Sequence, residues 1–253
     1  LVVGLIYPAI RTLILSFMDK RAEEFVGFEN YVWAFTIPEI TVVLTNTAIW
    51  VVTVPILSTV IGLAIAYMTD RMKRPAAIKS LIFMPMAISF VGAGVIWKFV
   101  YDGNYGLVPQ VGDLLHTELP FVLADKLWVI PAIMLVITWK YFGFHMMIFI
   151  AGLQSIPSEV IEAARLDGVR KWQIVRHIKL PMVRSAIVIS VFFAITGALQ
   201  LFDIIIPLTN GGPSHSSHTI VTFLYQFGIL RMKLGFGGAV SVLLFIACVV
   251  VAL

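Results

Sequence analysis

The sequence predicts an all-α membrane protein, and three observations support this fold class. Hydrophobic residues make up 60% of the 253 residues and charged residues only 13%, whereas a soluble domain holds about 45–50% apolar and about 25% charged residues. The mean hydropathy is +0.97. Apolar runs of about 20 residues, the length that a helix needs to cross a bilayer, recur along the chain. A soluble core would have no use for such runs.

Six apolar runs follow one another along the chain, and each is expected to form one helical span. The first begins at or before Leu1 and contains Pro8 and Arg11; it lacks the basic start and the small-residue cleavage site of a signal peptide. Trp97 and Tyr101 near the end of the third run form an interfacial aromatic pattern. The expected spans are residues 1–18, 42–69, 80–101, about 127–152, 183–207 and about 236–253.

The charges of the loops predict how these spans are oriented. The loops at 70–79 and 153–184 hold ten Lys or Arg and four acidic residues, whereas the alternate loops at 19–41, 102–126 and 208–235 hold five Lys or Arg and nine acidic residues. By the positive-inside rule the first pair faces the cytoplasm, and both ends of the chain are expected there. This topology also accounts for the pI near 9.2 without a nucleic-acid partner.

The single cysteine, Cys248, lies in an apolar run. One chain can therefore form neither a disulfide framework nor a cysteine-ligated metal site. We also expect no other metal site and no catalytic residue. The sequence contains no internal repeat, low-complexity tract or second domain. Residues 1–253 are expected to form a single transmembrane domain.

The polar stretch between the fourth and fifth runs is longer than a turn requires. It cannot enter the bilayer because it carries many ionisable side chains, namely Glu162, Arg165, Asp167, Arg170, Lys171, Arg176, His177 and Lys179. Pro157 suits the first turn of a helix, and Gly168 fits a helix stop. We expect a short helix at about residues 157–167, outside the membrane and well placed to be held by a partner.

The same stretch contains residues at a fixed spacing: Glu162-Ala163-Ala164, three residues, Gly168, nine residues, Ile178, one residue, Leu180-Pro181. This order resembles the EAA loop of ABC-importer permeases, and it is complete at every position. The resemblance implies that the short helix is a coupling helix that docks in a cleft of a cytoplasmic ATPase, within a cytoplasmic loop at residues 153–182. A connector without a partner is the alternative. The coupling residues implied are Glu162, Ala163, Ala164, Asp167 and Gly168.

Other stretches resemble the carbohydrate branch of this family, the maltose-permease group. Residues 25–31 look like the segment that follows the first span in that branch, and residues 153–157 look like its lead into the coupling helix. Residues 200–213 resemble its fifth-span exit. The similarity runs over nearly the whole chain. One departure lies in the loop at 102–126, where residues 109–110 are Pro and Gln and relatives often have an Asn.

Polar residues in the fifth run are the first candidates for the substrate pathway, because polar groups in a span usually face a bundle interior or a cavity. Thr196, Gln200 and Asp203 are spaced i, i+4, i+7 and are expected on one helical face. Gly197 lets a ligand or a helix approach that face closely. Gln200 can donate and accept hydrogen bonds, which suits a neutral polyhydroxylated ligand. Packing between helices is the alternative role.

The fourth run offers a second set of candidate substrate contacts. Thr138, Tyr141 or Phe142, and His145 are expected to share a face. Aromatic rings beside hydrogen-bonding groups are what a sugar site needs, because sugar C–H faces stack on rings while hydroxyls are satisfied. A hydrogen-bonded histidine inside the bundle is an equally good interpretation of His145.

Two further polar residues lie in the spans. Lys140 needs a partner or water, and Asp203 or an anionic substrate could supply it. Asn46, early in the second run, is a weaker candidate for substrate binding.

Taken as a whole, the resemblance implies a six-helix bundle of the type I ABC importer kind, multi-pass in the cytoplasmic (inner) membrane of a prokaryote. The chain has no GxxxxGK[ST] phosphate loop, so ATP and Mg would be bound by two copies of a separate ABC ATPase. Because the family works with two permeases, a second homologous permease is implied. A periplasmic or lipid-anchored binding protein would deliver a sugar or oligosaccharide, which crosses by alternating access.

Three alternatives remain at this point. The importer could carry another polar solute, such as glycerol phosphate. An intramembrane enzyme of the serine protease kind would need an activated Ser with a His base, and no GxSG-type site occurs in any run. A secondary transporter often has internal repeats, which this sequence lacks. Dependence of uptake on ATP separates an ABC importer from the enzyme and from the secondary transporter.

Overall fold

The computed structural model describes residues 2–69, 72, 75–117 and 119–252. Within them the regular structure is helical, and the only strand-like feature is an isolated bridge between Met18 and Phe25. The all-α prediction is confirmed. Three of the four basic residues of the predicted cytoplasmic loop at 70–79 lie outside the described residues, as does Glu118.

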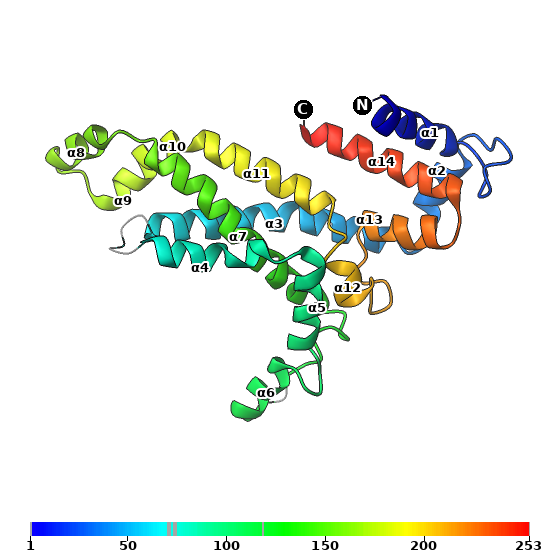
Figure 1. The fold of residues 1–253 in the computed structure, drawn as a ribbon, viewed down its shortest axis with the longest axis horizontal. Coiled ribbons are helices and arrows are strands. Elements are labelled where there is room, and N and C mark those ends of the chain that lie inside the picture. The colour runs from blue at the N-terminus through cyan, green and yellow to red at the C-terminus, as the bar shows by residue number, and fades with distance from the viewer. Residues whose placement is uncertain (1, 70–71, 73–74, 118, 253) are drawn as a thin grey trace. The chain divides into compact units, whose positions relative to one another are not determined.

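The helices alternate between long apolar elements and short connecting ones (Figure 1). In chain order they are η1 (Val2–Ile6), α1 (Tyr7–Leu15), α2 (Glu29–Thr36), α3 (Ile40–Thr69), α4 (Pro75–Ala87), α5 (Phe90–Val100), α6 (Leu107–Leu114), α7 (Val129–Gln154), α8 (Ser158–Leu166), α9 (Lys171–Ile174), η2 (Val175–Lys179), α10 (Leu180–Met182), α11 (Arg184–Leu199), α12 (Ile205–Thr209), α13 (Ile220–Phe223), η3 (Leu224–Leu230) and α14 (Leu234–Ala252).

The chain divides into two compact units. The first is formed by Leu1–Val51, Phe90–Val136 and Thr196–Leu253, and the second by Val52–Ser89 and Ile137–Ile195. Three helices, α3, α7 and α11, contribute residues to both units.

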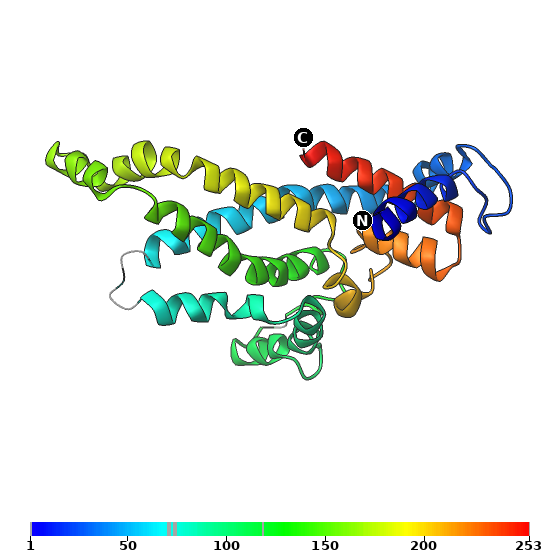
Figure 2. The same ribbon diagram turned by 45° about the horizontal axis from the view of Figure 1, so that its top comes forward.

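The core of the first unit gathers where α14 packs against α2, α13 and η3. Figures 1 and 2 both show α14 alongside α1. Phe223 is fully buried, and its ring stacks on that of Phe227 with centroids 4.3 Å apart. Burial of each such aromatic side chain contributes about 1.5–3 kcal/mol. The buried cluster consists of Ala34, Ile37, Ile40, Val43, Ile220, Phe223, Phe227, Phe236 and Val240.

The core of the second unit lies between α3, α7 and α11. Glycines allow close approach of helices: a Cβ on Gly62 of α3 would lie 2.7 Å from the Cβ of His145 in α7, and one on Gly143 of α7 would lie 2.6 Å from the carbonyl oxygen of Ile82 in α4. Small residues at helix contacts serve this purpose in membrane bundles. The buried cluster consists of Ala66, Met146, Phe149, Ile150, Leu153, Val183 and Ala186.

Two helices of the described chain, α3 and α7, are long and apolar enough to cross a membrane singly. They match the second and fourth predicted spans. Two broken helix pairs raise the number to four if each pair forms one span, and the first and last predicted spans contain shorter apolar helices, Val3–Leu15 and Leu234–Val250. By length and composition alone, the described helices provide two to four candidate spans, where the sequence predicted six.

The third predicted span, at 80–101, is not one helix but two, α4 and α5, separated at Ile88 and Ser89. Pro85 lies inside α4, where its ring removes one backbone donor and crowds the preceding turn. The carbonyl oxygens near the break accept hydrogen bonds from the side chain of Lys140 instead. The prediction of a continuous helix was wrong because these contacts join residues far apart in sequence.

The fifth predicted span, at 183–207, ends early. Its helix α11 stops at Leu199, and the short helix α12 begins at Ile205. The carbonyl oxygen of Leu201 accepts a hydrogen bond from Thr219 Oγ1 at 3.1 Å, which satisfies it outside any helix. The helical face expected to join Thr196 to Asp203 therefore does not extend beyond the end of α11.

The three loops predicted on the outer side each contain helix as well. In the last of them, α13 and η3 run from Ile220 to Leu230, because Ile220, Phe223 and Phe227 enter the core of the first unit. The prediction treated this segment as a loop because it contains polar and glycine-rich parts.

Candidate functional site

The helix α8 has the position and length predicted for a coupling helix, within one residue at each end. Its C-terminal end forms a Schellman motif: the backbone N–H of Val169 donates to the carbonyl of Ala164 at 3.0 Å, and that of Gly168 donates to Arg165 at 3.1 Å. This motif requires a left-handed residue, and Gly168 has φ +75°. The glycine of the signature therefore ends the helix and turns the chain.

Most of α8 is exposed. Ala164 is buried at 8% exposure, whereas Glu162 and Ala163 are exposed. Leu166 is 89% exposed, and Trp172 in the following turn is 53% exposed. The loop thus offers a partner both carboxylates and large apolar side chains.

The rest of the signature lies in the short helices that follow α8, within the second unit. Ile178 lies in η2, and Leu180 and Pro181 begin α10; Ile178 and Leu180 are half-buried. The run from Lys171 to Met182 is bent by 67° against α11.

Among the fourth-run candidates, His145 is enclosed by its own unit. It is fully buried, and its Nδ1 lies 2.7 Å from Ser190 Oγ, which in turn lies 3.1 Å from Thr59 Oγ1. These contacts link α7, α11 and α3. Its Nε2 is buried without a hydrogen-bond partner in the described part of the chain. The geometry favours the bundle-histidine interpretation, in which His145 holds three helices together.

The other fourth-run candidates are more open. Thr138, Tyr141 and Phe142 are half-buried, and the ring of Tyr141 lies 6.1 Å from that of His145. Thr138 Oγ1 is buried and has no hydrogen-bond partner among the described residues. An unpaired buried hydroxyl is costly, so this atom is expected to gain a partner, such as an ordered water.

Lys140 is 1% exposed, and the structure supplies partners for its charge. Its Nζ donates to the carbonyl oxygen of Pro85 at 2.9 Å, to that of Met86 at 3.4 Å, and to that of Ile88. These carbonyls end α4, where the helix dipole is negative and the last carbonyls lack partners within the helix. Lys140 therefore acts as a cap on a broken helix.

The fifth-run candidates cluster at the end of α11. Thr196 and Gly197 are half-buried in its last turn, and Gln200 follows the helix and is exposed. The backbone N–H of Gln200 donates to the carbonyl of Gly197 at 3.2 Å. Asp203 is exposed in the turn that follows.

Asn46 binds backbone. It is 5% exposed, and its Nδ2 donates to the carbonyls of Ser216 at 2.7 Å and of His218 at 3.0 Å. Asn46 thus holds the glycine-rich loop that follows α12 against α3. The sequence could not reveal this role, because the partners lie about 170 residues away.

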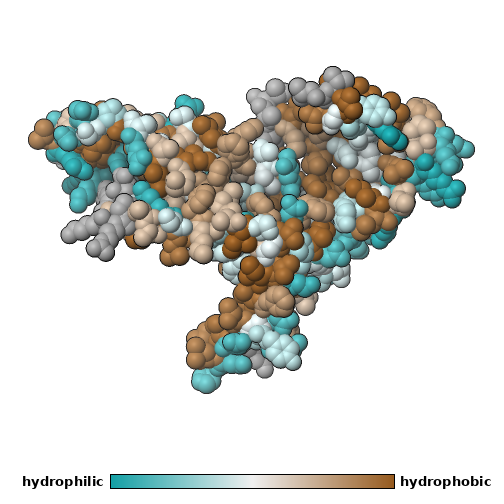
Figure 3. Space-filling view, in the orientation of Figure 1, coloured by the Kyte–Doolittle hydropathy of each residue, from teal (hydrophilic) through white to brown (hydrophobic). Residues whose placement is uncertain are grey.

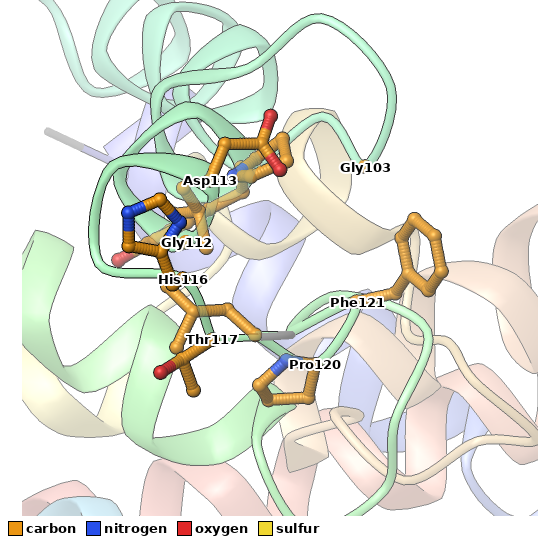
Figure 4. Close-up of a pocket in the computed structure, with 11 residues that line it drawn as sticks. Gly103, Gly112, Asp113, His116, Thr117, Pro120 and Phe121 are labelled. Atoms are coloured by element: carbon orange, nitrogen blue, oxygen red, sulfur yellow. The ribbon is translucent and has the colours of Figure 1, made fainter.

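A cavity of about 570 Å³ lies in the predicted outer loop, whose role the sequence left open. Figure 4 shows Asp113 and His116 from α6 and the turn after it, with Phe121 across from them. Gly103 leaves the space that the Phe121 ring fills. Nowhere in the described chain do three His, Cys, Asp or Glu side chains gather as a metal site would require.

Residues 42–253 match the family described as "Binding-protein-dependent transport system inner membrane component". The chain belongs to this family. It is a membrane-embedded, non-catalytic permease subunit of a transport system, which confirms the family resemblance and excludes the intramembrane enzyme.

Curated relatives support the same family. The chain is 37% identical over 251 residues to the osmoprotective compounds uptake permease protein GgtC of Synechocystis sp., with 97% of this chain and 89% of that protein covered. It is 38% identical over 213 residues to the alpha-glucoside transport system permease protein AglF of Rhizobium meliloti, covering 82% and 63%. It is 34% identical over 249 residues to the sulfoquinovosyl glycerol transport system permease protein SmoG of Agrobacterium fabrum, covering 95% and 80%.

A solved structure shares the fold. One chain of a bacterial ABC transporter involved in the import of the acidic polysaccharide alginate superposes with a TM-score of 0.88 at 21% identity, covering 99% of this chain and 86% of that one. The predicted fold of the type I ABC importer kind is confirmed. The coupling and substrate residues stay predictions.

Proposed function

We propose that this chain is one of two permease subunits of an ATP-driven importer for a glycoside or oligosaccharide, in the cytoplasmic membrane of a prokaryote. The observation that carries the proposal is α8: an exposed helix with the complete EAA signature, ended by a positive-φ glycine. The relatives named for alpha-glucoside and sulfoquinovosyl glycerol transport support a glycoside substrate.

In this proposal α8 docks into a cleft on one of two cytoplasmic ATPase subunits, which bind ATP and Mg. Glu162, Ala163, Asp167 and Gly168 belong to the docking surface, whereas Ala164 is buried. A second, homologous permease contributes the other coupling helix. A periplasmic or lipid-anchored binding protein delivers the sugar. ATP drives the cycle because the dimerised ATPases stabilise one of two permease states more than the other.

The substrate contacts are proposed separately for each unit. In the first, Thr196, Gly197 and Gln200 at the open end of α11 are proposed contacts. In the second, Thr138, Tyr141 and Phe142 are proposed contacts, since all are half-buried. His145 and Asn46 are proposed to support these contacts indirectly, because their described hydrogen bonds are made within the protein.

Reconstitution tests the proposal. The chain would be assembled with its second permease and ATPases in proteoliposomes, with the cognate binding protein outside and ATP inside. A panel of labelled glycosides, with glycerol phosphate and an amino acid as controls, would first be screened for binding to the binding protein. The proposal expects uptake of a glycoside that requires both ATP and binding protein. Uptake without ATP, or ATP-driven uptake of a control solute but of no glycoside, would overturn it.

A further inference from the structure

The short helix α6 has two unlike faces. Leu107, Val111 and Leu114 are 57%, 47% and 79% exposed, and Leu115 at its C-cap is 63% exposed. At 3.6 residues per turn these four positions span an arc of about 100°, the width of the apolar stripe of an amphipathic helix. Asp113 lies away from this stripe and lines the cavity. Figure 3 shows apolar surface, in brown, over the region of α5 and α6.

Aromatic residues lie at both ends of the loop at 102–126, which carries α6, and they indicate its depth relative to the membrane. Before it, the half-buried Trp97 near the end of α5 packs against Tyr101, with ring centroids 5.2 Å apart; Tyr101 itself is 7% exposed and donates from its hydroxyl to the carbonyl of Ala132 at 3.0 Å. After it, Trp128 precedes α7 and is 49% exposed. Tryptophan and tyrosine gather at the membrane–water interface. Trp97 and Trp128 therefore favour a position near the headgroup level for both ends of this loop.

The charge of Asp102 also indicates that the start of this loop lies at the membrane–water interface. The backbone N–H groups of Tyr105 and Asn104 donate to its carboxylate at 2.9 and 3.0 Å, and they hold the pKa of this carboxyl below its usual range. A charged carboxylate stays in water. The helix α6 begins five residues later, at Leu107, so at about 3.3–3.6 Å per residue it starts within roughly 18 Å of Asp102.

The apolar surface of α5 leads toward this helix. Val91, Val95 and Phe99 are spaced four residues apart on one face, and all are exposed, Phe99 at 73%. The residues of α6 contain one charge, Asp113. Within α6 itself the apolar stripe carries no charge, which suits the boundary between headgroups and acyl chains.

We propose that α6 lies along the outer leaflet, with Leu107, Val111 and Leu114 inserted among the lipid chains and Asp113 facing water. The partner is the lipid surface itself. The inference concerns no transported solute and so stands apart from the proposed function. Its consequence is that the cavity beside Asp113 is held at the water side of the interface.

Fluorescence quenching tests the proposal. A cysteine replaces Leu114 in a Cys248→Ala background and carries a bimane label, and the chain is reconstituted with its partner subunits in nanodiscs that contain brominated phospholipid. We expect the bimane emission to shift to shorter wavelength and to be quenched by brominated lipid but little by aqueous iodide. A label at Val111 gives an independent repeat. A label at Asp113 is the matched control and should show the reverse.

Two outcomes would overturn the proposal. In the first, iodide quenches the labels at Leu114 and Val111 as strongly as the label at Asp113, and the helix stands in water. In the second, the two labels are shielded from both quenchers, and a protein covers the stripe. Repeating the measurement with and without the binding protein would then identify that protein as the binding protein or another subunit.

Discussion

The conformation of Gly168 predicts how the coupling helix responds to mutation. Gly168 has φ +75°, and a Cβ placed on it would meet no atom within 4 Å. Replacement by alanine therefore adds no clash within the chain and introduces backbone strain. A left-handed conformation costs a residue with a Cβ about 1–2 kcal/mol. The free loop can escape this strain by fraying the Schellman bonds to Ala164 and Arg165, but the docked helix cannot.

The strain therefore opposes docking, and about 1–2 kcal/mol corresponds to a factor of roughly 5–30 in the affinity of the permease for its ATPase. We expect Gly168→Ala to weaken the association of the permease with its ATPase by this factor and to reduce ATP hydrolysis stimulated by loaded binding protein. Gly168→Asn is the matched control, because asparagine tolerates the left-handed region better and should lose less. Membrane insertion should be unchanged in both variants.

The assay is titration of the ATPase onto permease in nanodiscs, with stimulated hydrolysis measured on the same preparation. The expected order of affinity is Gly, then Asn, then Ala. An alanine variant that binds and couples normally, or one that outperforms asparagine, would refute the link between positive φ and coupling.

Three further predictions follow from the described contacts. Lys140→Met keeps the long side chain but leaves the carbonyls at the end of α4 without their donor. It should lower the free energy of unfolding by about 1–3 kcal/mol, measured by thermal melting. An unchanged melting temperature contradicts the capping role. Gln200→Leu should reduce transport efficiency roughly ten- to hundred-fold with normal assembly, since a lost hydrogen bond costs about 1–3 kcal/mol; poor assembly with unchanged affinity for the sugar would assign Gln200 to packing. In a Cys248→Ala background, a cysteine at Lys171 should react with impermeant reagents only from the cytoplasm and one at Asp113 only from outside, and the reverse pattern would overturn the charge-based orientation.

Local rules predicted the elements whose determinants lie close together in the chain. Hydropathy alone located α3 and α7. Pro157 and Gly168 bounded α8 to within one residue, because a first-turn proline and a left-handed glycine act on their own neighbours. The EAA signature was equally local, and the family it indicated was confirmed.

The errors arose where distant residues decide the local structure. The break between α4 and α5 is satisfied by Lys140, more than 50 residues away. The early end of α11 is satisfied by Thr219. The contacts of His145 and Asn46 likewise join separate helices and loops. A pattern on one helix therefore could not distinguish a ligand contact from a hydrogen bond that holds the fold together. The sequence showed that these polar groups needed partners but could not name them.

The central claim is that a cytoplasmic ATPase drives this permease through α8, and site-specific cross-linking tests it most directly. A photoreactive amino acid at Leu166, which is 89% exposed on that helix, would be activated in the assembled complex, with one at Phe99 of α5 as control. We predict that the Leu166 position captures the ATPase subunit and that the cross-linked complex no longer transports, whereas the Phe99 position does not capture the ATPase. Failure of Leu166 to capture the ATPase in a complex that still transports would contradict the account.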